Sequence, residues 1–233
     1  MFRVLVVEDI ESVLNRLATE LQSAFLAPEG ETLLKVYPAK SVKDGLTLID
    51  EGHARNRPFH AAVLDFKLPQ SAGEDAKMDE SLCLAIKRKM PNALVVHITS
   101  HSTDPFVANH INIYHLGGRG AEAEVLPKKA EWPTKLEAIL KKFLYGTRIE
   151  QQLDRLFGAD SAITPYSSRT AFLPSRSQGE RSLTHALATL AREIEEHWVD
   201  LDEGLQTRIK AIFRVDTYDD SVRVSLINPE KVE

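Results

Sequence analysis

The first half of the chain alternates between short apolar runs and longer segments whose hydrophobic residues have helical spacing. The run at residues 3–7 ends directly on acids, as a strand buried on both faces does. Similar runs predict four more strands, at residues 33–37, 61–64, 94–98 and 124–126. Segments with helical periodicity predict five helices, at residues 11–26, 41–52, 79–89, 104–115 and 132–145.

Five strands that alternate with five helices predict an α/β fold, a doubly wound parallel sheet covered by helices on both faces. Right-handed crossover connections then bring the carboxyl ends of all strands to one edge of the sheet. Ligands of such sheets bind at that edge, near the point where the strand order switches.

The second half has a different pattern. Residues 147–157 can continue the last helix, whereas residues 158–179 are rich in Ser, Thr, Pro and Gly and show no period. Residues 180–198 and 202–214 have the spacing of two amphipathic helices, and residues 220–227 alternate like a strand. We therefore predict three parts: a domain at residues 1–145, a helix extension and linker at 146–179, and a small, mainly helical C-terminal module at 180–233.

Composition adds limits to this picture. The 233 residues include 43% hydrophobic and 27% charged residues, which is ordinary for a soluble globular protein. No apolar run approaches the roughly 18 residues of a membrane helix, and the apolar run at the N-terminus is too short for a signal peptide. The single cysteine, Cys83, allows no internal disulfide and no cluster of zinc-binding cysteines, so we expect a reducing, cytoplasmic setting.

Charge argues against nucleic acid as the partner. The formal net charge is −5, and residues 146–233 carry 11 basic against 15 acidic residues. Arg208, Lys210 and Arg214 lie on the second predicted tail helix, but acids precede them. A DNA-binding helix needs a basic surface, so we expect no DNA binding. The amphipathic helix pair leaves two uses open, formation of a homodimer and docking to a downstream protein partner or to the first domain.

The residues that could take part in catalysis or metal binding lie where the predicted strands end. Glu8 and Asp9 follow the first strand, Asp65 ends the third, Thr99 follows the fourth and Lys128 follows the fifth. Two carboxylates about 4 Å apart repel by about 4 kcal/mol at an effective dielectric constant near 20. A divalent cation relieves that repulsion, and an all-oxygen site suits Mg²⁺.

In this order the strand-end motifs resemble the receiver domain of two-component response regulators. The matching segments are Val4-Leu5-Val6-Val7-Glu8-Asp9, Val63-Leu64-Asp65-Phe66-Lys67-Leu68-Pro69, His97-Ile98-Thr99-Ser100 and Leu126-Pro127-Lys128. The resemblance covers about residues 1–145. It implies a flavodoxin-like sheet with strand order 2-1-3-4-5, and a domain that takes a phosphoryl group from the phosphohistidine of a histidine kinase or phosphotransfer protein.

The resemblance also implies roles for individual residues. Asp65 would be the phosphoacceptor, and Glu8, Asp9, Asp65 and the backbone carbonyl of Lys67 would hold Mg²⁺. Thr99 would be the switch hydroxyl, and Lys128 would pair with the phosphoryl oxygens. Any catalysis would be limited to self-catalysed phosphoryl transfer and loss of the aspartyl phosphate.

Two other functions remain open. A pseudo-receiver would keep the fold as a protein-interaction module without phosphorylation, and Val125 and Lys129 favour it because the family usually has an aromatic residue and a proline there. A Mg²⁺-dependent phosphohydrolase would usually need a second acid two positions after the first, where this chain has Lys67. The polar segment at residues 70–80 is an insertion that is either a solvated surface loop or a lid or docking loop.

Several residues have ordinary structural interpretations. His97, His101, His110 and His115 lie close in sequence, but their spacing matches no compact metal motif. His101 and Lys67 flank the acceptor and are hypothesised to tune the lifetime of the phosphoryl group. We expect Cys83 in the core, Trp132 and Trp198 as packing anchors, and His185 as a core or surface residue rather than a phosphotransfer histidine.

Overall fold

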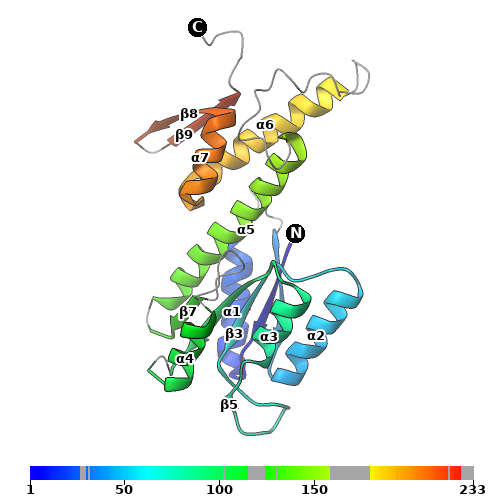
Figure 1. The fold of residues 1–233 in the computed structure, drawn as a ribbon, viewed down its shortest axis with the longest axis vertical. Coiled ribbons are helices and arrows are strands. Elements are labelled where there is room, and N and C mark those ends of the chain that lie inside the picture. The colour runs from blue at the N-terminus through cyan, green and yellow to red at the C-terminus, as the bar shows by residue number, and fades with distance from the viewer. Residues whose placement is uncertain are drawn as a thin grey trace. The chain divides into compact units, whose positions relative to one another are not determined.

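The computed structural model describes residues 1–26, 30, 32–101, 103–114, 124–129, 131–157, 179–219 and 221–226. The chain divides into two compact units, residues 1–140 and residues 141–233 (Figure 1). Among the described helices, none combines the length and the apolar character that crossing a bilayer requires.

A five-stranded parallel sheet forms the centre of the N-terminal unit. Its strands are β1 (Phe2–Val7), β2 (Leu34–Ala39), β3 (Ala61–Asp65), β6 (Leu94–Thr99) and β7 (Glu124–Pro127). They pair in the order β2-β1-β3-β6-β7, and all four pairings are parallel. This confirms the predicted fold class and the predicted strand order 2-1-3-4-5.

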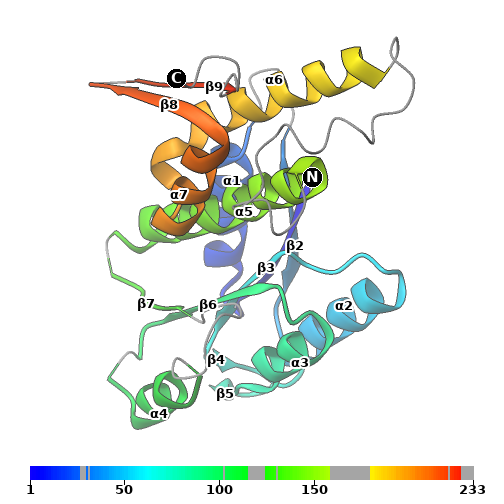
Figure 2. The ribbon, with the colours of Figure 1, turned by 45° about the horizontal axis from the view of Figure 1, so that its top comes forward.

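Helices cover both faces of the sheet (Figure 2). They are α1 (Glu11–Ala24), α2 (Val42–Ala54), α3 (Ser81–Lys89), α4 (Pro105–Tyr114) and α5 (Trp132–Phe157). Helices α2 and α3 lie together against one face, and α1 lies with the beginning of α5 against the other.

The three central strands, β1, β3 and β6, are buried on both faces, which explains their continuous apolar runs. Val4, Leu5, Val6 and Val7 have no exposed surface, although alternate residues of a strand point to opposite sides. Leu5 and Val7 belong to the core between the sheet and the helices α2 and α3. Each such side chain that leaves water contributes about 1.5–3 kcal/mol, so the central strands supply much of the stability of this unit.

The segment after Asp65 is more ordered than a simple insertion. Strand β4 (Lys67–Leu68) pairs with β5 (Lys77–Met78) in an antiparallel ladder. The backbone N–H groups of Val42 and Lys43 donate to the carbonyls of Pro69 and Gln70, so the same segment is held against the start of α2. The predicted insertion is therefore a short hairpin beside the strand edge, and a role as a lid or docking loop stays a prediction.

His60 links the start of β1 to the loop before β3. Its Nδ1 accepts a hydrogen bond from the backbone N–H of Arg3 at 3.0 Å, and its ring packs edge-on against Phe2 with the ring centroids 5.8 Å apart. Burial lowers the pKa of His60, because the charged imidazolium loses hydration there. Protonation at Nδ1 would also remove the acceptor of this hydrogen bond.

We expect the stability of the N-terminal unit to fall as the pH drops below 6.5, the ordinary histidine value. The unfolded chain binds a proton at His60 more readily than the folded protein, so stability is lost as the pH falls toward the lowered pKa. Urea unfolding of the parent and of His60→Gln at neutral pH and near pH 5 measures this. The variant should lose less stability between the two pH values, with His53→Gln, on the exposed face of α2, as the control. Equal losses in the parent and His60→Gln would contradict this account.

The described residues of the C-terminal unit form three α-helical segments, a 3₁₀ turn and a hairpin, which pack around a core of their own. After residues 141–157 of α5 come α6 (Gly179–His197), the 3₁₀ turn η3 (Trp198–Asp200), α7 (Glu203–Ile212), β8 (Phe213–Tyr218) and β9 (Ser221–Leu226). Buried residues from all of these segments form one cluster, with Trp198 among them, as predicted. The predicted linker at residues 158–179 lies almost wholly outside the described residues.

One helix of this unit was predicted two residues too long, and the strand that follows it was not predicted. The helix expected at residues 202–214 ends at Ile212, and Phe213 begins β8, which pairs with β9 in an antiparallel hairpin. Phe213 is nearly fully buried and packs edge-on against Phe157 with the ring centroids 5.9 Å apart. Tertiary burial of that ring outweighs the local helical pattern, as it often does at element boundaries.

The basic residues of this region contact neighbours inside the unit. Arg208 pairs with Asp154 at 2.5 Å, and Arg214 pairs with Asp216 at 3.1 Å. The ammonium of Lys210 lies 5.5 Å from the ring centroid of Trp198. Each of these three basic side chains therefore contacts a residue of the same unit. The expectation that the module does not bind DNA stays a prediction. His185 is exposed on α6, one of its two expected ordinary placements.

Candidate phosphoacceptor site

The strand order brings the predicted site residues to one edge of the sheet. Glu8 and Asp9 follow β1, and Asp65 ends β3, which pairs directly with β1. Thr99 ends β6, the neighbour of β3 on the other side, and Lys128 follows β7. All five residues therefore leave the carboxyl ends of adjacent parallel strands, as predicted.

The ammonium of Lys128 bridges two buried carboxylates. Its Nζ lies 2.6 Å from Oδ2 of Asp65 and 2.7 Å from Oε2 of Glu8. Glu8 is fully buried and Asp65 is 7% exposed, so these charge-assisted hydrogen bonds are largely shielded from water. The lysine comes from a position 63 residues after Asp65, and only the fold brings the two together.

Backbone N–H groups donate hydrogen bonds to four further oxygen atoms of Glu8, Asp65 and Thr99. The N–H of Ile10 donates to Oε1 of Glu8, and the N–H of Lys67 donates to Oδ1 of Asp65, each at 3.2 Å. The Thr99 hydroxyl oxygen accepts from the N–H of His101 at 2.9 Å, and the Thr99 carbonyl accepts from the N–H of Lys128 at 2.7 Å. These hydrogen bonds fix the strand ends and preorganise the side chains.

The site shifts the acid–base behaviour of Glu8 and Lys128. Burial raises the pKa of Glu8, and the hydrogen bond and positive charge of Lys128 offset this only in part. Burial would lower the pKa of Lys128, but its hydrogen bonds to Asp65 and Glu8 and their negative charges outweigh burial and raise it. Lys128 therefore stays charged over the physiological range.

The carboxylates suit a hard divalent cation. Glu8, Asp9 and Asp65 each offer an oxygen, and these three oxygens lie within 4.8 Å of one another. In an octahedral Mg²⁺ site, opposite oxygens are about 4 Å apart and neighbouring oxygens about 3 Å apart, because each Mg–O bond is about 2.0–2.1 Å long. Side-chain movements would have to bring the three oxygens closer together to reach those spacings. Asp9 is only half-buried, so the cluster is reachable from solvent.

Four further residues named in the sequence analysis lie close in the chain to the site residues. The side chains of Lys67 and His101 are exposed, and each residue lies two positions after a strand-end residue of the site, Asp65 and Thr99 respectively. Val125 is half-buried on β7, and Lys129 is exposed directly after Lys128. His115 lies outside the described residues.

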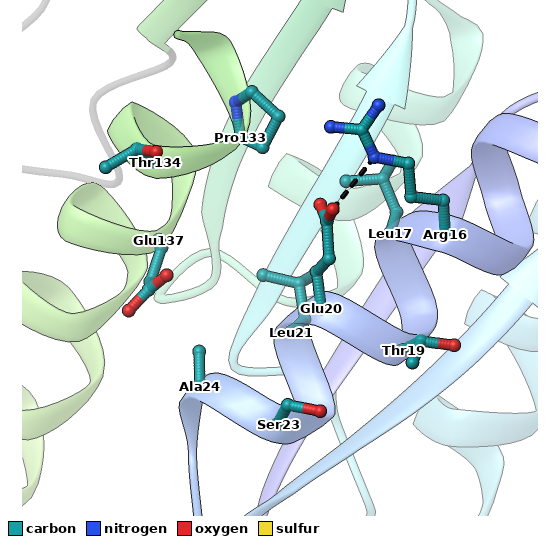
Figure 3. A pocket seen from close by; sticks show the side chains of 10 residues that line it. All are labelled: Arg16, Leu17, Thr19, Glu20, Leu21, Ser23, Ala24, Pro133, Thr134 and Glu137. Atoms are coloured by element: carbon teal, nitrogen blue, oxygen red, sulfur yellow. Dashed lines mark hydrogen bonds and ion pairs between the residues drawn. The ribbon is translucent and has the colours of Figure 1, made fainter.

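A hollow elsewhere in the same unit is distinct from this site. It has a volume of about 530 Å³ and lies between α1 and the beginning of α5 (Figure 3). Leu17 and Leu21 line it from α1, Pro133 and Glu137 line it from α5, and Arg16 pairs with Glu20 at 2.8 Å along it. None of the strand-end acids lines this hollow.

One grouping was not predicted from the sequence. The structure brings His97 and His110 together with Cys83, whereas His101, which is nearer in sequence to His97, is exposed. No spacing rule could have indicated this, because the three residues belong to three different elements. Alternation along β6 indicates only which face of the sheet His97 lies on, the same face as the buried Val95. It does not indicate that Cys83 or His110 is nearby.

Comparisons with known proteins give matches among solved structures only. No protein-family model and no curated protein matches the chain. The HemR receiver domain from Leptospira biflexa is 21% identical, with a TM-score of 0.42, over 58% of this chain and 89% of that chain. A response regulator receiver protein from Sinorhizobium medicae WSM419 is 16% identical, with a TM-score of 0.45, over 61% and 94%. The RcsB response regulator from Salmonella typhimurium is 14% identical, with a TM-score of 0.42, over 91% and 100%.

Proposed function

We propose that the chain is a response regulator whose N-terminal unit accepts a phosphoryl group on Asp65. The observation that carries this proposal is the bridge from Lys128 to both Asp65 and Glu8 at the edge of the sheet, with Asp9 beside them. A nucleophilic carboxylate, a fixed cation and a carboxylate cluster for a divalent cation are the parts that phosphoryl transfer needs.

In the proposed reaction, an oxygen of Asp65 attacks the phosphorus of a phosphohistidine on a kinase or phosphotransfer protein. The new O–P bond forms as the N–P bond breaks, and the imidazole leaves with the electron pair and takes up a proton. Lys128 pairs with the oxygens of the moving phosphoryl group and holds Asp65 in place beforehand. Glu8, Asp9, Asp65 and the carbonyl of Lys67 would hold Mg²⁺, which neutralises negative charge on those oxygens when it is bound.

The modification would be transmitted through Thr99. Its side chain is fully buried at the end of β6, and its hydroxyl oxygen accepts from the backbone N–H of His101. An aspartyl phosphate carries about two negative charges where the carboxylate carried one, so phosphorylation adds about one negative charge and three acceptor oxygens beside that hydroxyl. If the hydroxyl turns to donate to the phosphoryl group, it loosens the hydrogen bond from His101 and shifts the loop that leads to α4. The proposed output is a protein interaction of the C-terminal unit, as a homodimer or with a downstream partner in the cytoplasm.

The test is incubation of the full chain with acetyl phosphate and Mg²⁺, followed by intact-mass spectrometry. The parent protein should gain the mass of one phosphoryl group, and Asp65→Asn should gain none. Asp50→Asn is the matched control, because Asp50 is an exposed carboxylate on α2 that pairs with Lys89. A phosphoryl group that remains in Asp65→Asn would place the acceptor elsewhere, with His185 the first position to examine.

Val125 and Lys129 support a second candidate, a pseudo-receiver that keeps the site without phosphorylation. That candidate predicts no mass gain in the parent, with acetyl phosphate or with a phosphorylated histidine kinase. The third candidate, a Mg²⁺-dependent phosphohydrolase, predicts release of many phosphates per protein from small phosphoesters. The same sample can be assayed for all three outcomes.

A further inference from the structure

Two imidazoles and a thiol converge in the interior of the N-terminal unit. Cys83 lies on α3, His97 on β6 and His110 on α4, and one potential ligand atom of each lies within 4.8 Å of the other two. Cys83 has no exposed surface, and His97 and His110 are each 1% exposed. An apolar core would fill this space at lower cost, since buried imidazoles lose their hydration.

Aromatic rings hold the two histidines in a fixed arrangement. The ring of Phe66 stacks on His97 with the centroids 4.0 Å apart and the planes 11° from parallel. The same ring meets His110 edge-on at 4.9 Å, and the two imidazoles meet each other at 4.7 Å and 75°. Phe66 therefore forms an apolar wall that restrains both imidazoles.

A carboxylate contacts the Nδ1 atom of one of the two histidines. Oε2 of Glu80 lies 3.2 Å from Nδ1 of His110. With Nδ1 engaged by Glu80, Nε2 is the nitrogen of His110 that a metal ion would bind. A carboxylate that orients a histidine in this way is the usual outer partner of a metal-binding imidazole.

We propose that Cys83, His97 and His110 form a binding site for Zn²⁺. One sulfur and two nitrogens are the ligand types that Zn²⁺ takes in a tetrahedral site, with water in the fourth position. The cluster of Glu8, Asp9 and Asp65 offers only oxygen, so the two sites select different cations. In a tetrahedral Zn²⁺ site with one sulfur, the ligand atoms are about 3.3–3.6 Å apart, because the bonds are about 2.0–2.3 Å long, and modest side-chain shifts reach that spacing.

Binding would require the thiol of Cys83 to release its proton to solvent and form a Zn–S bond. Burial raises the pKa of Cys83 to about 11, so the metal-free protein holds a neutral thiol. The bound cation stabilises the thiolate and compensates for this shift, as in other sites where metal binding releases protons.

The proposed ion would tie together three elements near the phosphoacceptor site. It would join α3 and α4 to β6, whose last residue, Thr99, lies two positions after His97. Phe66, which covers the imidazoles, directly follows Asp65. Occupancy would fix the position of α4 relative to the sheet. The binding proposal itself does not depend on phosphorylation of Asp65.

Cobalt is a suitable probe, because a Co²⁺–thiolate bond gives a charge-transfer absorption band that oxygen ligands do not give. The full chain is freed of metal with a chelator and titrated with Co²⁺ in excess Mg²⁺, which keeps the acidic cluster occupied. We expect the band to saturate at one equivalent and to disappear when Zn²⁺ is added. Cys83→Ser should lack the band and bind Zn²⁺ at least about 100-fold more weakly, and Glu80→Gln should keep the band and bind about 10–100-fold more weakly.

Asp9→Asn separates the two metal sites, since it alters the acidic cluster and should leave the band unchanged. Circular dichroism establishes that each variant is folded, and Glu80→Gln changes a partly exposed side chain in case Cys83→Ser does not fold. The proposal is overturned if Co²⁺ binds without the sulfur band. It is also overturned if the band survives in Cys83→Ser, or if Glu80→Gln leaves the Zn²⁺ affinity unchanged.

Discussion

Replacement of Lys128 by methionine is expected to lower the free energy of unfolding of the N-terminal unit by about 3–5 kcal/mol at neutral pH without Mg²⁺. Methionine keeps the length of the side chain but removes the ammonium that bridges Glu8 and Asp65. Two buried carboxylates then face each other with no cation between them, and an uncompensated buried charge costs far more than a lost surface ion pair. Chemical denaturation measures the change.

The pH dependence of this loss follows from the two raised pKa values. Burial holds the pKa of Glu8 in the folded protein above its ordinary value of 4.5, and loss of the Lys128 ammonium would raise it further. The folded variant then binds a proton more readily than the unfolded chain, so it should recover stability as the pH falls through the raised pKa toward 4.5. The raised pKa of Lys128 stabilises the parent below 10.5, and this contribution is lost as the pH rises through the folded value. The gap between parent and variant should therefore be widest near neutral pH.

Mg²⁺ should restore part of the stability of Lys128→Met, because the cation supplies the positive charge that the carboxylates have lost. The matched control is Lys129→Met, which removes an exposed lysine at the next position and should change stability by less than about 0.5 kcal/mol. A loss below about 1 kcal/mol in Lys128→Met would mean that the bridge does not hold the strand ends together. No stabilisation of Lys128→Met by Mg²⁺ would argue against a cation site at Glu8 and Asp65.

Most of the sheet could be predicted from the sequence because its central strands are buried on both faces. Runs such as the one that includes Val4 and Val7 have no helical period and end on charged residues, so each strand and its carboxyl end could be located. Parallel pairing then required the acids to meet at one edge. The contact between Lys128 and Glu8, 120 positions apart, follows from this topology.

Other features depend on contacts that no local pattern encodes. Phe213 has helical spacing with Ile209, and only its packing against Phe157 reveals that a strand begins there. The two-residue strands β4 and β5 are too short to give a periodic signal. Cys83, His97 and His110 were each interpretable as ordinary buried residues, because they meet only after three elements have packed.

Asp9→Asn is expected to raise the Mg²⁺ concentration that gives half-maximal phosphorylation by acetyl phosphate at least about 10–100-fold. Even the loss of an outer partner of a metal ligand has an effect of that size, and Asp9 would contact the ion directly. Asp9 is half-buried, so asparagine can occupy the same volume without leaving a cavity. The bridge from Lys128 to Asp65 does not involve Asp9, and the nucleophile should therefore stay in place.

The measurement is the initial rate of phosphoryl incorporation as a function of Mg²⁺ concentration, with thermal unfolding as the test of an intact fold. Glu11→Gln is the matched control, because Glu11 lies two positions after Asp9 on α1 and pairs with Lys40 at 2.9 Å, outside the cluster. Its Mg²⁺ dependence should equal that of the parent. If Asp9→Asn also kept the parental Mg²⁺ dependence, the cation would have to be held by Glu8 and Asp65 without Asp9. If the Mg²⁺ concentration for half-maximal phosphorylation rose equally in both variants, the cause would be the general negative potential at this end of the sheet. Added salt screens that potential, so its effect should disappear at high ionic strength, whereas the effect of a lost ligand should persist.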